Sequence, residues 1–196
     1  MKQIFLSLFF LLLAFNTNVA SDTSNSIQRI VEGNKDSKVT IITYESLTCN
    51  HCADFHKNIY PQLKKEFIDT GLVRIEFRHF PLDMAALNAS KISLCTNNGN
   101  SKTLHFLFSN QEKWIKGETI EDINKNLKKL LKSEYSFLDF EQCINNKTVE
   151  DYILNDRIEG VQKFKVNATP TIIINNKKFD KSLNYKNLKK SIEKLI

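Results

Sequence analysis

Residues 38–77 constrain the fold of this chain more than any other stretch. Residues 38–44 are rich in β-branched side chains, which is typical of a strand. The apolar residues that follow recur at a spacing of four, which predicts a helix that ends at Gly71, and residues 72–77 alternate as a second strand. This order predicts two parallel strands joined by a right-handed crossover. Because Pro61 lies inside the helix and removes a backbone hydrogen bond, we expect a kink there.

Two of the four cysteines lie at the start of this helix, beyond the carboxyl end of the first strand: Cys49 in its first turn and Cys52 one turn further in. Haem attachment needs a histidine directly after the second cysteine, and Ala53 occupies that position. A structural zinc site needs four ligands, of which the pair and His56 would supply three. Copper(I) suits two thiolates better, so a copper site remains an alternative. A passive disulfide across so short a span would restrict the unfolded chain little.

The spacing of the pair has a direct physical reason in redox chemistry. Unpaired N–H groups and partial positive charge at a helix N-terminus stabilise a thiolate at Cys49, and Cys52 is close enough to resolve a mixed disulfide. Lowering a cysteine pKa by about five units requires about 7 kcal/mol, whereas a helix terminus supplies at most about 2 kcal/mol. Further hydrogen bonds are therefore needed. His51 is the candidate donor, and an exposed histidine without a role is the alternative.

The chain beyond the second strand is mainly helical in its pattern. The predicted helices cover residues 84–95, 103–114, 120–131, 137–144 and 149–164. A strand over residues 170–175, a hairpin turn at Asn175 and Asn176, a partner strand over 177–180 and a helix over 185–196 complete the chain. The predicted class is therefore α/β. Residues 21–83 and 164–196 form the two halves of one sheet domain, and residues 84–163 form a helical insertion.

Residues 1–20 are typical of a secretory signal peptide. Lys2 gives a positive start, an apolar run follows, and small residues end the segment. The run is too short to span a bilayer, although an uncleaved anchor is the alternative. We expect cleavage after Ala20 or Ser21 and a mature protein in an oxidising compartment, where cysteines remain paired.

The formal net charge of +6 does not indicate a nucleic-acid partner. A nucleic-acid binder concentrates its positive charge on one element. Here the lysines are spread along the chain among Asp, Glu and Asn, and we interpret them as a solvated surface.

Three motifs, in this order, resemble the DsbA family of periplasmic thiol:disulfide oxidoreductases, most closely its α-proteobacterial type. The motifs are SLTCNHCA at residues 46–53, FRHFPLD at 77–83 and VNATPT at 166–171. The resemblance extends from about residue 27 to the C-terminus and implies a thioredoxin fold with an inserted all-helical subdomain. It also implies that Cys49 attacks, that Cys52 resolves, and that Thr169 contacts substrate. Pro170 would be cis, although most X-Pro bonds are trans.

Two positions depart from the pattern of that family. Asn50 stands where the family usually has proline, and this dipeptide tunes the redox potential, so the oxidant strength stays open. Thr43 stands where many relatives have a buried acid. Glu45 should lie on the same face of the strand as Thr43, because side chains alternate. Glu45 either transfers protons to Cys52 in place of that acid or is a plain surface acid.

The remaining cysteines, Cys95 and Cys143, lie in the helical insertion. Four cysteines allow three pairings, and a redox pair at the other two leaves these for each other. Relatives of the α-proteobacterial type often have such a second, structural bridge, while two separate buried thiols are the alternative. His79 and His105 fit packing or surface positions better than ligand positions.

We expect the protein to introduce disulfides into exported proteins in the periplasm through Cys49 and Cys52, acting on unfolded or folding chains. The resemblance implies a membrane-bound, quinone-linked partner that reoxidises the pair, and we expect neither a cofactor nor a metal. The alternatives are a disulfide isomerase or reductase of the same fold and a non-enzymatic copper-binding module. Isomerases of this fold usually add an N-terminal dimerisation domain, and we expect none here.

Overall fold

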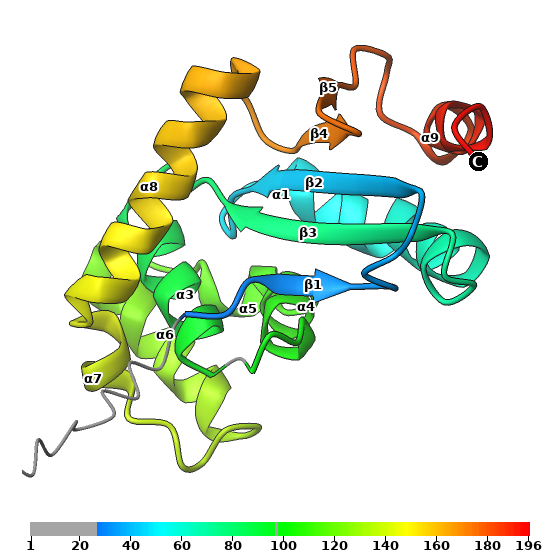
Figure 1. The fold of residues 1–196 in the computed structure, drawn as a ribbon. Coiled ribbons are helices and arrows are strands. Elements are labelled where there is room, and N and C mark those ends of the chain that lie inside the picture. Colours follow the sequence, from blue (N-terminus) through cyan, green and yellow to red (C-terminus); the bar gives the residue numbers. More distant parts are fainter. Residues whose placement is uncertain (1–26, 97) are drawn as a thin grey trace, which may run out of the picture.

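A five-stranded mixed sheet lies at the centre of the computed structural model, which describes residues 27–96 and 98–196 (Figure 1). The predicted signal peptide falls outside these residues. The strands are β1 (Ile30–Glu32), β2 (Val39–Glu45), β3 (Val73–His79), β4 (Thr171–Ile174) and β5 (Lys177–Lys178), in the sheet order β1-β3-β2-β4-β5. The parallel pairing of β2 with β3 is confirmed, with Ile41 opposite Ile75.

The edge strand β1 is missing from the sequence-based prediction. It pairs antiparallel with β3, so that Ile30 lies opposite Phe77. Three residues are too few for an alternating pattern to be recognised, so only the pairing with β3 identifies the strand. Its last residue, Glu32, is brought to the edge of the sheet.

The crossover from β2 to β3 is a helical run with two π-helical segments. It consists of α1 (Asn50–Asp54), η1 (Phe55–Ile59), α2 (Tyr60–Leu63) and η2 (Lys64–Ile68). Pro61 lies in the first turn of α2, directly after the wider π-helical segment η1. Because proline has no N–H to donate, the helix is irregular at this point, and the predicted irregularity takes the form of a π-helical turn. Gly71 follows the run with a positive φ of 77°.

Helices fill the chain between β3 and β4. They are α3 (Met84–Cys95), α4 (Lys102–Ser109), α5 (Gln111–Trp114), α6 (Ile120–Lys132), α7 (Phe140–Ile144) and α8 (Lys147–Phe164). The predicted helix over residues 103–114 is wrong in one respect, because Asn110 breaks it into α4 and α5. The Asn110 side chain donates to the Phe106 carbonyl oxygen, as short polar side chains do where they end a helix. Helix α7 also starts later than predicted, because Asp139 caps it by accepting from the Gln142 N–H.

The chain ends with a hairpin and a helix, as the sequence predicts. Asn175 and Asn176 turn β4 into β5 with φ values of 44° and 64°, the left-handed region that asparagine tolerates. Helix α9 (Tyr185–Glu193) follows. Its apolar residues Leu188 and Ile192 are fully buried.

Different helices cover the two faces of the sheet (Figure 1). Tyr44, Phe80 and Phe164 belong to a cluster between the sheet and helix α8. Ile41 points to the opposite face, into the main core with Leu63 of the crossover helix and Ile192 of α9. Because side chains alternate along β2, Thr43 and Glu45 point to the same face of the sheet as Ile41, the face that the crossover helix with the cysteine pair covers.

Candidate redox site

Cys49 lies at the N-terminus of helix α1, directly after strand β2. It is the N-cap residue of α1 in an extended conformation, and its side chain is half-buried. The carbonyl oxygen of Cys49 accepts from the N–H groups of Cys52 and Ala53, which begins the helix. Cys52, one turn further, is completely buried. Both cysteines are free thiols in this structure.

The surroundings of Cys49 favour its thiolate. A hydrogen bond from the Cys52 thiol makes the largest contribution to lowering the pKa of Cys49, and the backbone N–H groups of Cys52 and His51 add to it. Although partial burial opposes these hydrogen bonds, together they lower the pKa of Cys49 from an ordinary 9.0 to about 5. Direct hydrogen bonds therefore supply what the helix terminus alone cannot.

Cys52 has the opposite tendency. Burial raises the pKa of its thiol far above the ordinary value, and the neighbouring Cys49 and the charge of Glu45 raise it further. At neutral pH the reduced pair therefore holds one proton, on Cys52, and one negative charge, on Cys49. Such a division lets the more accessible sulfur of Cys49 react and leaves the buried sulfur of Cys52 to resolve.

The loop before strand β4 faces the pair. The peptide bond between Thr169 and Pro170 is cis, and the Cys49 Sγ lies 3.3 Å from the Thr169 carbonyl oxygen. An open pocket of about 610 Å³ adjoins this contact, and its lining includes His51, Thr169, Pro170 and Tyr185. Residues of two distant motifs, 46–53 and 166–171, thus meet beside one sulfur atom.

The two residues that replace the family's acid are both buried. Thr43 and Glu45 are 0% and 1% exposed, so the interpretation of Glu45 as a surface acid is wrong. The Glu45 Oε2 lies 2.8 Å from the His56 Nε2. Glu45 therefore packs against the helical run that carries the redox pair, one turn beyond Cys52.

His51 and Asn50 lie in the first turn of α1 and are exposed to solvent. The backbone N–H of His51 contributes to the low pKa of Cys49. A role for the His51 imidazole remains a prediction.

Cys95 and Cys143 are joined by a disulfide that links the end of α3 to α7. Their Cα atoms are 5.7 Å apart, and the bond closes a loop over a sequence separation of 48.

The metal-binding alternative gains no further ligand from the structure. Among residues 27–96 and 98–196, no group of three or more His, Cys, Asp or Glu side chains is placed to hold a metal ion. His56, the third ligand considered, has both ring nitrogens in hydrogen bonds, to Glu45 and to His105.

Sequence reasoning missed the connection between His56 and His105. The two histidines are 49 residues apart and their side chains are in contact. No local pattern predicts such a contact, because it depends on how α4 packs against the crossover helix.

Comparison with known proteins identifies the family. The thioredoxin family model matches residues 25–194. The solved structure of Wolbachia pipientis alpha-DsbA1 superposes with a TM-score of 0.76 at 29% identity, over 85% of this chain and 90% of that chain. Disulfide bond formation protein D of Bacillus subtilis is 25% identical over 173 residues, which are 84% of this chain and 75% of that protein.

A Rickettsia conorii protein assigned as a protein-disulfide oxidoreductase is 30% identical over 148 residues, 74% of this chain. The match covers 53% of that protein, so this chain spans about half the length of the Rickettsia relative. The chain belongs to the thioredoxin family, and its relatives place it among the DsbA-like members of that family. In the part of the chain that the structure describes, no helix is long and apolar enough to cross a membrane.

Proposed function

We propose that this protein is a thiol:disulfide oxidoreductase that introduces disulfides into exported proteins. The observation that carries the proposal is the uneven pair: the pKa of Cys49 is lowered to about 5, while that of the buried Cys52 is raised. A stable thiolate stabilises the reduced form, so the disulfide is readily passed to another protein. This favours the oxidase over an isomerase or reductase of the same fold.

The proposed reaction is a pair of thiol–disulfide exchanges. A client thiolate attacks the Cys49 Sγ, a bond between the client sulfur and Cys49 forms, and the bond between Cys49 and Cys52 breaks. Cys52 leaves with the electron pair and takes up a proton. A second client thiolate then attacks the client sulfur of the mixed disulfide and releases Cys49 as a thiolate. The client loses two electrons, the enzyme pair gains them, and one of the two client protons goes to solvent.

The pocket beside Cys49 suits an extended segment of a client chain. We assign substrate contact to Thr169 and Pro170, since both line this pocket and the Thr169 carbonyl oxygen lies beside the Cys49 Sγ. An extended peptide could pair with backbone groups at this edge as an added strand. We assign His51 to the support of the thiolate and the Cys95–Cys143 bridge to the stability of the insertion.

The compartment and the partners follow from the chemistry. The signal-like residues 1–20 and the Cys95–Cys143 disulfide support a periplasmic location, because disulfides persist in oxidising compartments. The clients would be unfolded or folding exported proteins. Each turnover leaves the pair reduced, so an oxidant must restore it, and a quinone-linked membrane protein is the proposed source.

The test is oxidative refolding of a reduced, denatured client that contains disulfides. The oxidised protein should restore client activity in stoichiometric amounts, and the Cys49→Ser variant should not. The control is the Cys95→Ala/Cys143→Ala double variant, which should retain the activity at temperatures where it is folded. Equal refolding by the wild type and Cys49→Ser would rule out the proposal.

A further inference from the structure

A chain of hydrogen bonds runs from the buried Glu45 to Glu32 in the edge strand β1. The Glu45 Oε2 lies 2.8 Å from the His56 Nε2. The His56 Nδ1 lies 3.0 Å from the His105 Nδ1, and the His105 Nε2 lies 2.8 Å from the Glu32 Oε1. Four elements contribute one residue each: β2, η1, α4 and β1.

The contacts in this hydrogen-bond chain require one hydrogen more than two neutral imidazoles supply. There are three short contacts, between two carboxylates and two rings, and each contact needs one hydrogen between its atoms. A neutral histidine carries one ring N–H, so two histidines account for two of the three. The third hydrogen is an excess proton that shifts along the chain when each ring accepts at one nitrogen and donates at the other.

The Glu45 end of the hydrogen-bond chain lies beside the redox pair. Cys52 lies four residues before His56 on the same helical run, so the two side chains share the face of this run that packs against Glu45. The charge of Glu45 accordingly raises the pKa of the buried Cys52 thiol. The second oxygen of Glu45, Oε1, is buried and has no hydrogen-bond partner in the described part of the chain. A buried carboxylate oxygen without a partner is costly to maintain, and it is suited to accept a proton.

The middle of the hydrogen-bond chain, at His56 and His105, is enclosed by aromatic rings. The His56 ring stacks on Phe108 at a centroid distance of 4.1 Å, and the His105 ring stacks on Tyr60 at 4.4 Å. Phe77 contacts both histidine rings edge-on or tilted. The His56 side chain is only 5% exposed, so protons reach Glu45 along the ring nitrogens rather than through bulk water.

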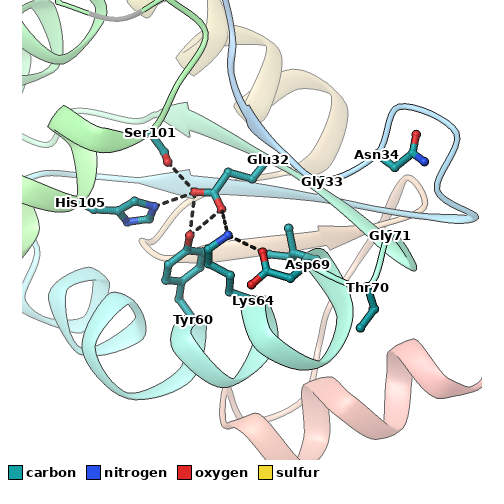
Figure 2. Close-up of a pocket in the computed structure, with 11 residues that line it drawn as sticks. Glu32, Gly33, Asn34, Tyr60, Lys64, Asp69, Thr70, Gly71, Ser101 and His105 are labelled. Atoms are coloured by element: carbon teal, nitrogen blue, oxygen red, sulfur yellow. Dashed lines mark hydrogen bonds and ion pairs between the residues drawn. The ribbon is translucent and has the colours of Figure 1, made fainter.

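The other end opens to solvent in a pocket of about 720 Å³ (Figure 2). The His105 side chain is 25% exposed and lines this pocket with Glu32. Although burial opposes it, hydrogen bonds from His105, Ser101 and Tyr60 lower the pKa of Glu32 to about 2. Glu32 is thus a fixed anion that holds the His105 Nε2–H in place. Lys64 lies 3.3 Å from its other oxygen.

We propose that Glu45, His56 and His105 form a proton path between Cys52 and the pocket at Glu32. The path rests on the proposed function, because it supplies the proton that Cys52 takes up when it leaves and removes the same proton when Cys52 attacks. Glu45 exchanges the proton with the sulfur. His56 and His105 are positioning and relay residues, and Glu32 orients His105.

Both half-reactions balance along this path. When Cys52 leaves as a thiolate, His56 gives its Nε2 proton to Glu45, which passes a proton on to the sulfur, and His105 passes its Nδ1 proton to the His56 Nδ1. This leaves His105 neutral with its Nε2–H on Glu32, and the partly exposed ring regains its second proton from solvent in the pocket. On reoxidation the direction reverses, so that Cys52 becomes a thiolate and attacks Cys49 in the mixed disulfide.

The test follows the reaction of the reduced protein with oxidised glutathione in rapid-mixing experiments. In the first phase Cys49 forms a mixed disulfide with glutathione, which needs no proton from Cys52. In the second phase Cys52 loses its proton and releases the glutathione. The His105→Gln variant keeps hydrogen-bonding capacity but cannot relay a proton. It should leave the first phase within about twofold and slow the second at least about tenfold, as loss of general acid–base catalysis does.

Two further variants separate a proton path from a structural role. His105→Ala should show the same slow second phase, and added imidazole, which can enter the open pocket, should restore most of the rate. Ser101→Ala, which removes one hydrogen bond to Glu32 without interrupting the path, should react like the wild type. An unchanged second phase in His105→Gln, or no rescue by imidazole in His105→Ala, would overturn the path. Absence of the first phase in the wild type would instead overturn the proposed function.

Discussion

At the scale of single residues, the central feature is the unequal protonation of two sulfurs three positions apart. Cys49 receives hydrogen bonds from the Cys52 thiol and from backbone N–H groups, and its pKa falls to about 5. Cys52 is buried beside the charge of Glu45, and its pKa rises. Between these two pKa values the reduced pair binds one proton.

This difference predicts how the reduction potential depends on pH. Reduction adds two electrons and one proton between pH 5 and 8, so the potential should fall by about 30 mV per pH unit there. Below pH 5 Cys49 also becomes protonated, and the slope should double. Equilibration with glutathione buffers at several pH values measures the slope. The doubled slope at pH 7 would show that both thiols are protonated and would contradict the assignment.

At the scale of elements, helix α8 depends on one glycine for its approach to the sheet. Gly160 faces Tyr44, and a Cβ at this position would lie 2.7 Å from the Tyr44 Cε1. The ring cannot move aside, because Tyr44 is completely buried between Phe80 and Phe164. The close approach of α8 therefore depends on the missing side chain.

Gly160→Ala should destabilise the protein. The better helix propensity of alanine contributes about 1 kcal/mol, while overpacking of a filled core costs about 1–3 kcal/mol. Because a Cβ contact of 2.7 Å is too close to be accommodated without a shift, the upper part of this overpacking range applies, and we expect a net loss of about 1–2 kcal/mol in urea unfolding. Ile158→Ala on the same helix is the control, because Ile158 is half exposed, and it should change stability by about 0.5 kcal/mol or less. A variant at position 160 as stable as the wild type would disprove the close packing.

The elements also show how far local patterns determine the structure. Strands β2 and β3, the crossover helix and the final hairpin were predictable, because their patterns extend over many residues or carry turn signals such as Asn175-Asn176. Strand β1 and the break at Asn110 were not. A three-residue edge strand exists only through its pairing with β3, and the break is caused by one side chain that bonds to the backbone.

At the scale of the whole molecule, the Cys95–Cys143 bridge ties two helices of the insertion together, apart from the redox pair. Its removal in Cys95→Ala/Cys143→Ala should lower the free energy of unfolding by up to about 4 kcal/mol, by the chain-entropy estimate for a loop of this length. Client oxidation below the unfolding temperature should persist. Loss of oxidation in the folded double variant would assign the bridge a catalytic role.

The site shows the same division between local and global information. Cys49, Cys52, Thr169 and Pro170 could be identified from short motifs, whereas their meeting at one sulfur required the resemblance to a family. The path through His56, His105 and Glu32 could not be predicted, since it joins residues from three elements whose packing no local pattern specifies. The roles of charged and polar side chains in the core can be assigned only from the three-dimensional structure.

The most direct test of the account is an ultraviolet titration of the Cys49 thiolate in the reduced protein, with Cys49→Ser as the blank. The account predicts a single transition with its midpoint near pH 5. A midpoint near 9, the ordinary value for a cysteine, would show that the surroundings do not stabilise the thiolate and would contradict the account.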